Sequence, residues 1–181
     1  MKGFTLIEVL VVASITVMIG GLLISNFSRT RLDLNQATLI IQDAIREAQS
    51  MALSGALYGR PGTYRCGYGV HFLPDGVQIY AGPDSSGGAC SSQDRNYNGG
   101  TDQIVRDIIL SNTAIEIPSA PDIFFEPPNP KTYINDVSTP NTSAVISVRK
   151  KGAPCPALFT DPRTPDCRQI YVSTAGRIQT Q

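Results

Sequence analysis

An acidic and amide-rich segment near the middle of the chain has the side chains that a hard cation requires. Oxygen-bearing residues recur at alternate positions, and a glycine stands where a calcium loop turns: Asp94, Asn96, Asn98, Gly99 and Asp102. Calcium takes six to eight oxygen ligands, and this spacing matches the first part of an EF-hand loop. The twelfth position, however, carries a valine in place of a bidentate glutamate. The sequence therefore predicts either a weak, incomplete calcium site or a solvated loop shaped by side-chain turns.

Four cysteines offer a second kind of chemistry, the formation of disulfides. They are Cys66, Cys90, Cys155 and Cys167, and four cysteines allow three pairings. We favour Cys66–Cys90 and Cys155–Cys167, because each pair flanks a local loop; the alternative is four unpaired or partly paired thiols. Zinc fits poorly, because there is no Cys-x-x-Cys spacing and His71 is the only histidine. Disulfides persist in oxidising compartments, so their presence would place this part of the chain there.

The remaining reactive side chains give little support for catalysis. His71 alternates with Val70 and Phe72 in an expected strand, which favours a structural role. The sequence contains no evident Ser/His/Asp set, phosphate-binding glycine loop or paired-carboxylate motif. We therefore expect that the protein is not an enzyme, and that it has no cofactor apart from the calcium ion considered above.

Basic residues gather toward the C-terminal end, although the chain as a whole has a formal net charge of zero. The candidates for contacts with DNA are Arg149, Lys150, Lys151 and Arg177. Their attraction to phosphate would be independent of sequence and sensitive to salt. Gln179 stands where a second basic residue would strengthen the pattern. A solvated basic face is therefore the favoured interpretation, and DNA binding is the alternative.

The N-terminal end of the chain is a long apolar run with a single ionisable side chain. The run extends from Phe4 to Phe27, about 24 residues, and is interrupted by Glu8. A helix of this length is long enough to cross a hydrocarbon core of roughly 30 Å. A carboxylate within such a helix is costly and calls for a partner. The small residue Gly3 precedes the run, whereas a secretory signal carries its small-residue cleavage site after the apolar region.

The elements that must position these residues follow from periodicity. Apolar residues recur every three or four positions beyond the run, at Leu34, Ala37, Ile41, Ala44, Ile45, Ala48, Met51 and Ala52. This spacing predicts one apolar stripe on a helix that extends from about Thr5 to about Leu57. The helix should end at Gly55, Gly59 and the turn residues that follow.

After Pro61 the pattern changes to short strands. Residues 68–72 and 77–81 alternate and are joined by Pro74-Asp75-Gly76, which predicts a β-hairpin. Further strands are expected at Ile104–Leu110, Ala114–Ile117, Ile123–Phe125, Ala144–Arg149, Gln169–Thr174 and the final residues 177–179. Residues 82–100 and the proline-rich stretches are expected to be loops.

The N-terminal motif resembles the signal of type IV prepilins and type II secretion pseudopilins. The residues that carry the resemblance are Gly3-Phe4-Thr5-Leu6-Ile7-Glu8 followed by Val9-Leu10-Val11-Val12. An Ala/Arg/Glu-rich helix segment at residues 44–48 and the C-terminal run 170–178 resemble the H-type minor pseudopilins and related minor pilins. Together the similar segments cover most of the chain in order.

The resemblance implies processing at the N-terminus and a role for Glu8. A prepilin peptidase would cut between Gly3 and Phe4 and methylate the new amine of Phe4. Glu8, the fifth residue of the mature chain, would pair with the terminal amine of a neighbouring subunit and set the register between subunits. The implied partners are other pilins or pseudopilins in a helical filament, the peptidase and the inner, cytoplasmic membrane.

The resemblance also implies a fold, an organisation and a location. The fold is α+β, with a long N-terminal helix, membrane-spanning in its first half and amphipathic in its second, packed on an antiparallel β-sheet domain. Residues 1–3 would be a leader, 4–28 the transmembrane half, 29–60 the amphipathic half and 61–181 a globular β domain. The chain would cross the cytoplasmic membrane once, with its N-terminus cytoplasmic and its globular domain outside, and then enter an extracytoplasmic filament.

The implied function is that of a minor pilin or pseudopilin, a structural subunit that helps to initiate or cap a type IV pilus or a type II secretion pseudopilus. Two alternatives stay open. One is a DNA-binding minor pilin in DNA uptake, and the other is a major pilin of the filament shaft.

Overall fold

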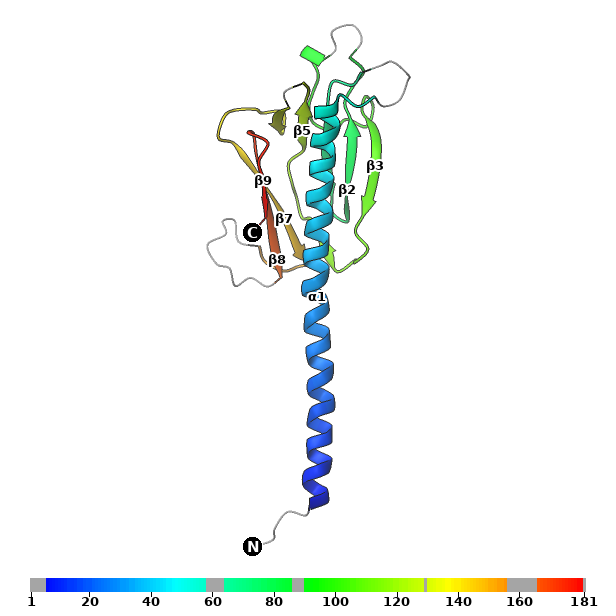
Figure 1. The fold of residues 1–181 in the computed structure, drawn as a ribbon, viewed down its shortest axis with the longest axis vertical. Helices are drawn as coiled ribbons and strands as arrows, with labels where there is room; N and C mark the ends of the chain where they lie inside the picture. The colour runs from blue at the N-terminus through cyan, green and yellow to red at the C-terminus, as the bar shows by residue number, and fades with distance from the viewer. Residues whose placement is uncertain (1–5, 58–63, 86–89, 129, 156–165, 181) are drawn as a thin grey trace.

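The computed structural model describes residues 6–57, 64–85, 90–128, 130–155 and 166–180, and within the helix it describes the side chains of residues 6–21 and 32–54. One helix, α1 (Leu6–Ser54), comes first, and the strands follow it. Figure 1 shows that the second part of α1 lies along the sheets, while its first part extends beyond them. We call the sheets, their loops and residues 32–54 of α1 the head.

Gly55 ends α1 because its backbone takes a left-handed conformation, with φ of 59°. The amide of Gly55 donates to the carbonyl of Ala52, and the amide of Ala56 donates to the carbonyl of Met51. This pair of bonds is a Schellman motif, in which glycine is favoured because it has no Cβ. The sequence prediction that Gly55 helps to end the helix is therefore confirmed.

The second part of α1 buries the apolar stripe that the spacing predicts. Its buried apolar side chains are Leu34, Ala37, Ile41, Ala44, Ile45, Ala48 and Ala52, while Met51 is half-buried. Gln42, a polar residue outside that stripe, is also buried. The buried face is wider than the apolar stripe because strands of both sheets pack against it.

A five-stranded antiparallel sheet forms one side of the head. Its strands, in spatial order, are β3 (Gln103–Ile109), β2 (Gly76–Ala81), β1 (Tyr68–Leu73), β5 (Ile123–Glu126) and β6 (Lys131–Ile134). The predicted hairpin is confirmed, because β1 and β2 pair around a turn with Leu73 opposite Gly76. Strand β6 was not predicted. Its four residues follow a proline-rich stretch, and only pairing with β5 makes them a strand.

A four-stranded antiparallel sheet forms the other side. Its strands, in spatial order, are β4 (Ile115–Glu116), β7 (Ser143–Lys150), β8 (Cys167–Ser173) and β9 (Ile178–Thr180). Strand β7 alternates between buried positions and partly buried ones, with its first and last residues exposed, as expected for a strand with one face on the core. Its buried residues are Ala144, Ile146 and Val148.

The main core lies between α1 and the two sheets. Apolar residues of the helix and of both sheets form one connected cluster. A second, smaller cluster of Tyr80, Phe124 and Tyr133 is flanked by Tyr97. Because successive side chains of a strand point to opposite faces, this aromatic cluster lies on the face of the five-stranded sheet that is turned away from α1. It is the platform on which the loop before β3 rests.

The predicted fold class and the predicted localisation are wrong as stated. Among the residues that the structure describes, no helix is long and apolar enough to cross a membrane. This finding contradicts a membrane-spanning first half and a single-pass location in the cytoplasmic membrane. The sheets themselves are antiparallel as predicted, and α1 packs on two of them.

Candidate functional site

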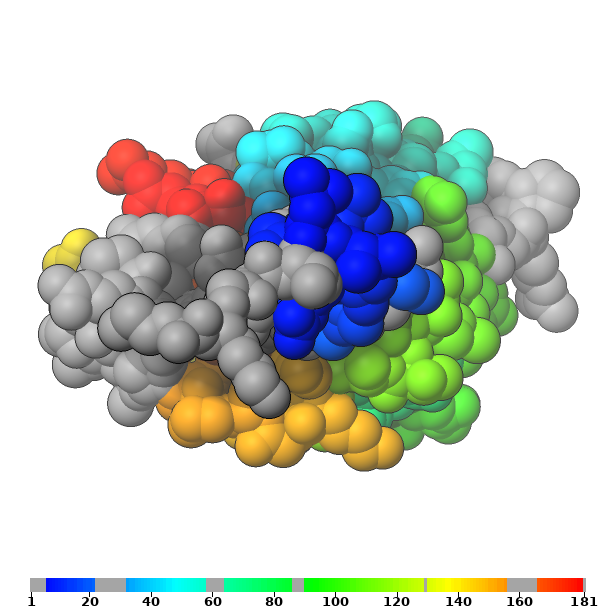
Figure 2. Space-filling model, turned by 90° about the horizontal axis from the view of Figure 1, so that it is seen from below, coloured from blue at the N-terminus to red at the C-terminus, as the bar shows by residue number. Residues whose placement is uncertain are grey.

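The first part of α1 is exposed almost everywhere along residues 6–21. Its large apolar side chains include Leu6, which is 83% exposed, and Val17, Met18 and Ile7, which are 70% or more exposed. Figure 2 looks along the molecule from this end, and the N-terminal residues project toward the viewer between the C-terminal strands and the region around β3. An apolar surface of this extent marks a site of association.

Glu8 lies in this segment beside a hollow that it lines with Val9, Val12 and Ala13. The hydroxyl groups that interrupt the segment are satisfied within the helix. Ser14 Oγ donates to the carbonyl of Leu10, and Thr16 Oγ1 donates to the carbonyls of Val12 and Ala13. Because these hydroxyls need no outside partner, they do not prevent the segment from packing against another apolar surface.

The packed part of α1 also has an outward-facing apolar stripe. Leu32, Leu39 and Leu53 are each more than half exposed. Leu39 follows Leu32 by about two helical turns and Leu53 follows Leu39 by about four, so all three lie on one face. The sequence prediction missed this stripe, although its spacing in multiples of seven residues was a readable signal.

Polar contacts hold α1 against both sheets. From β3, Arg106 Nη1 contacts Glu47 Oε2 at 2.8 Å, and from the turn before β4, Asn112 Nδ2 donates to Asp33 Oδ2 at 2.7 Å. From the other sheet, Arg168 Nε donates to Asn35 Oδ1 at 3.2 Å. Gln49 also donates to the carbonyl of Gly176 in the turn between β8 and β9. These contacts fix residues 32–54 of α1 to both sheets, and none of the pairings was predicted from the sequence.

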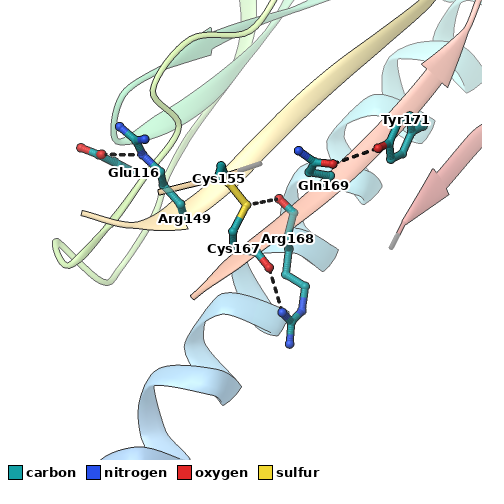
Figure 3. The surroundings of a disulfide bond; sticks show 7 residues. All are labelled: Glu116, Arg149, Cys155, Cys167, Arg168, Gln169 and Tyr171. Carbon is teal, nitrogen blue, oxygen red and sulfur yellow. Dashed lines mark hydrogen bonds and ion pairs between the residues drawn. A yellow bond between two sulfur atoms is a disulfide. The ribbon is translucent and has the colours of Figure 1, made fainter. Parts of the chain in front are cut away.

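Both predicted disulfides are present, Cys66–Cys90 and Cys155–Cys167. The first joins the segment before β1 to the loop before β3, and the second joins the segment after β7 to the start of β8. Figure 3 shows the second bridge beside the ion pair of Glu116 with Arg149. The described part of the chain contains no free cysteine. These bridges fit an oxidising compartment.

The predicted calcium residues lie in the loop before β3, whose residues 93–102 we call the acidic loop. Asp94 Oδ1 accepts from the amide of Asn96 at 2.9 Å, and Asn98 Oδ1 accepts from the amide of Gly100 at 3.0 Å. Asp102 closes the loop, because its Oδ2 accepts from the amide of Asn98 at 2.8 Å. These bonds are local side-chain turns that join Asp94 to Asn96, and Asn98 to Gly100 and Asp102, through backbone amides. Within the described residues, no three His, Cys, Asp or Glu side chains converge as a metal-binding group.

His71 helps to hold the acidic loop on the sheet. Its Nδ1 lies 2.8 Å from Asp122 Oδ1, and Asp122 Oδ2 accepts from the amide of Tyr97 at 2.9 Å. The ring of Tyr97 lies 4.7 Å from that of His71 and 5.2 Å from that of Tyr80, centroid to centroid. Tyr80 also donates through its hydroxyl to the carbonyl of Arg95. These contacts agree with the structural role expected for His71, and Asp122 was a partner that the sequence did not indicate.

The candidate DNA contacts do not form one patch. Arg149 is paired with Glu116, its Nε lying 2.9 Å from Oε1. Arg149 and Lys150 lie at the end of β7, whereas Arg177 follows Ser173, which pairs with Ser143 at the start of β7. At about 3.3 Å per residue, the two ends of this strand are some 20 Å apart. The separation favours a solvated basic surface over a DNA-binding segment.

The predicted processing site, Gly3 and Phe4, lies outside the described residues. No family model, no curated protein and no solved structure matches the chain.

Proposed function

We propose that the protein is a minor pilin or pseudopilin, a structural subunit that helps to initiate or cap a type IV pilus or a type II secretion pseudopilus. The observation that carries the proposal is the exposed apolar segment, residues 6–21, which projects from a head that is folded and disulfide-bonded without it. Glu8 is the single charge of that segment. This arrangement supports assembly through the helix, with the head turned outward.

The apolar segment supplies the association energy, and Glu8 supplies the register. Burial of apolar surface stabilises association by roughly 25 cal/mol per Å², and it acts without direction along the helix. A carboxylate buried in a bundle of helices is tolerated only where a positive group faces it. In the proposed assembly that group is the methylated amine of Phe4 on a neighbouring subunit, produced by prepilin peptidase cleavage after Gly3. The pair would therefore select one offset between subunits.

The first experiment replaces the charge and leaves the apolar surface. We expect Glu8→Val to lower the amount of the protein in sheared filaments or crosslinked pseudopili at least tenfold, while Thr16→Val, the matched control in the same segment, leaves it unchanged. Immunoblots of the assembled and cellular fractions measure the ratio. Equal incorporation of the two variants would remove the register role of Glu8.

The second experiment tests processing and copy number. Mass spectrometry of the mature chain should find N-methylated Phe4 at the N-terminus, and any other start contradicts the family proposal. Quantitative mass spectrometry of purified filaments should find this chain far below the shaft subunit in amount. A chain that dominates the filament would instead be the major pilin.

A further inference from the structure

The acidic loop contains buried oxygen atoms that no hydrogen-bond donor of the described residues reaches. They are Oδ1 of Asp102, Oδ1 of Asn96 and Oε1 of Gln93, whose amide nitrogen Nε2 also has no partner. Asp102 as a whole is only 8% exposed. A buried acceptor without a partner is costly, by roughly 1–3 kcal/mol and more if it is charged. Three such oxygens within ten residues indicate that the loop is shaped around something that supplies positive charge or donors.

Negative charge gathers around the orphan oxygen of Asp102. The carboxylates of Asp94 and Asp122 lie close enough to Asp102 to act on it electrostatically. Like charges held together in this way repel one another, and a cation among them would relieve that repulsion.

The arginine within the loop, Arg95, is directed away from Asp102. It contacts Glu126 and Asp136, each at 3.3 Å, and its guanidinium lies 4.2 Å from the centroid of the Tyr133 ring. Outside the loop, Arg65 donates to Gln103 Oε1 and to the carbonyl of Gly82. The loop therefore combines buried oxygens with nearby carboxylates.

We propose that the acidic loop binds a calcium ion, with Asp102 Oδ1 and Asn96 Oδ1 as its buried ligands and Asp94 as its exposed ligand. The donors are carboxylate and amide oxygens, which suit a hard cation and not zinc. Calcium also accepts backbone carbonyls and water in its shell, so two carboxylates are sufficient for a weak site. Magnesium fits less well, because it demands near-ideal octahedral geometry. The ion would tie the loop to β3 and to the aromatic platform beneath it, and this proposal does not depend on filament assembly.

The test compares two aspartates of the full chain, Asp102 in the loop and Asp107 on the exposed edge strand β3. Calcium chloride is titrated calorimetrically into the parent protein, and melting temperatures are recorded with millimolar calcium, magnesium or chelator. We expect a dissociation constant on the order of 10⁻⁴–10⁻³ M for calcium and a rise in melting temperature of about 2–4 °C. Asp102→Asn should weaken binding at least tenfold, and Asp107→Asn should leave it unchanged.

A second variant covers the case in which Asp102→Asn does not fold. Asn96→Ala removes an amide oxygen without changing charge, and it should also weaken calcium binding at least tenfold. A parent protein that ignores 10 mM calcium overturns the proposal, with the orphan oxygens then assigned to water. So does calcium binding that survives Asp102→Asn or Asn96→Ala, because the ion would lie elsewhere. An equal response to magnesium would show general charge screening and would also overturn it.

Discussion

The two described stretches of α1 have similar apolar content and opposite surroundings. Residues 32–54 carry an apolar stripe of which Leu34, Ile41 and Ile45 are fully buried against the sheets. Residues 6–21 carry at least as many large apolar side chains, and nearly all of them are exposed. The sheets therefore cover the apolar surface of residues 32–54, whereas no described part of the chain covers that of residues 6–21.

The packed stretch therefore contributes to the stability of the fold, and the exposed stretch leaves an apolar surface for association with other molecules. Apolar burial is the main favourable term in folding, and it acts only in residues 32–54 and in the sheets. The exposed stretch contributes helix propensity alone to the isolated chain. Substitutions of the same type in the two stretches should therefore differ greatly in their effect on stability.

The largest difference is expected for isoleucine. Ile45→Ala removes a fully buried side chain and should lower the free energy of unfolding by about 4 kcal/mol, because it leaves a cavity between α1 and the sheets. Ile15→Ala, the matched control, removes a side chain that is 53% exposed and should change it by less than about 0.5 kcal/mol. Urea unfolding followed by circular dichroism measures both. Similar losses in the two variants would contradict the division of the helix into packed and exposed stretches.

Removal of either disulfide should destabilise the head and leave the exposed stretch of α1 unaffected. Replacing Cys66 and Cys90 by alanine removes a bridge that spans a sequence separation of 24 residues. It should lower the free energy of unfolding by roughly 3 kcal/mol. Replacing Cys155 and Cys167 by alanine removes a bridge that spans a sequence separation of 12. The loss in the free energy of unfolding should be about 0.6 kcal/mol smaller than for the first bridge, because loop-closure entropy grows with the logarithm of loop length. The helicity of the exposed stretch should be unaffected. A larger loss from the shorter loop would show that the loop-entropy account fails here.

Replacing a glycine by alanine should change the stability in opposite directions in the exposed stretch of α1 and in the head. Nothing lies within 4 Å of a Cβ added at Gly20, so Gly20→Ala should stabilise the helix by about 1 kcal/mol. Gly176 in the head has φ of 77° and faces Gln49 Nε2, so Gly176→Ala should destabilise by about 1 kcal/mol or more. Thermal melts of both variants decide the signs. If Gly20→Ala stabilises the isolated chain but lowers incorporation into filaments, a neighbouring helix approaches closely at that position.

A carboxylate of the head provides the smallest expected effect. The pKa of Glu116 is lowered from 4.5, first by the amide of Gly152 and then, against an opposing effect of burial, by Arg149. A carboxyl whose pKa is lowered on folding stabilises the protein above its unfolded pKa, and this stabilisation is lost as the pH falls through the folded value. Glu116→Gln should therefore reduce the loss of stability between about pH 5 and pH 3. Asp107→Asn is the control, and an equal reduction there would contradict a specific role for Glu116.

Several features were predicted from the sequence because they depend on neighbours along the chain. The spacing of residues 34–52 defined the buried stripe, and Gly55 marked the end of the helix because only a residue without Cβ adopts its backbone conformation readily. The hairpin of β1 and β2 followed from its turn residues. The disulfide pairing followed from short separations, since short loops close most readily.

Other features required contacts between residues far apart in the sequence. Strand β6 exists because β5 pairs with it, and Gln42 is buried because two sheets, not one, cover the helix. The membrane-spanning half was predicted from the length of the apolar run, and the described helix does not support it.

The sequence by itself determined the residues of the acidic loop, their spacing and the placement of Glu8 at the start of an apolar helix. Only the tertiary structure decided that Asp102 is buried and that Oδ1 of Asp102 and Oδ1 of Asn96 are buried without partners. It also decided that Asp122 lies near Asp102, and that the basic residues of β7 and Arg177 lie apart. The physical reason is that periodicity and turn chemistry act over a few residues, whereas burial and the electric field at a side chain depend on every element packed around it.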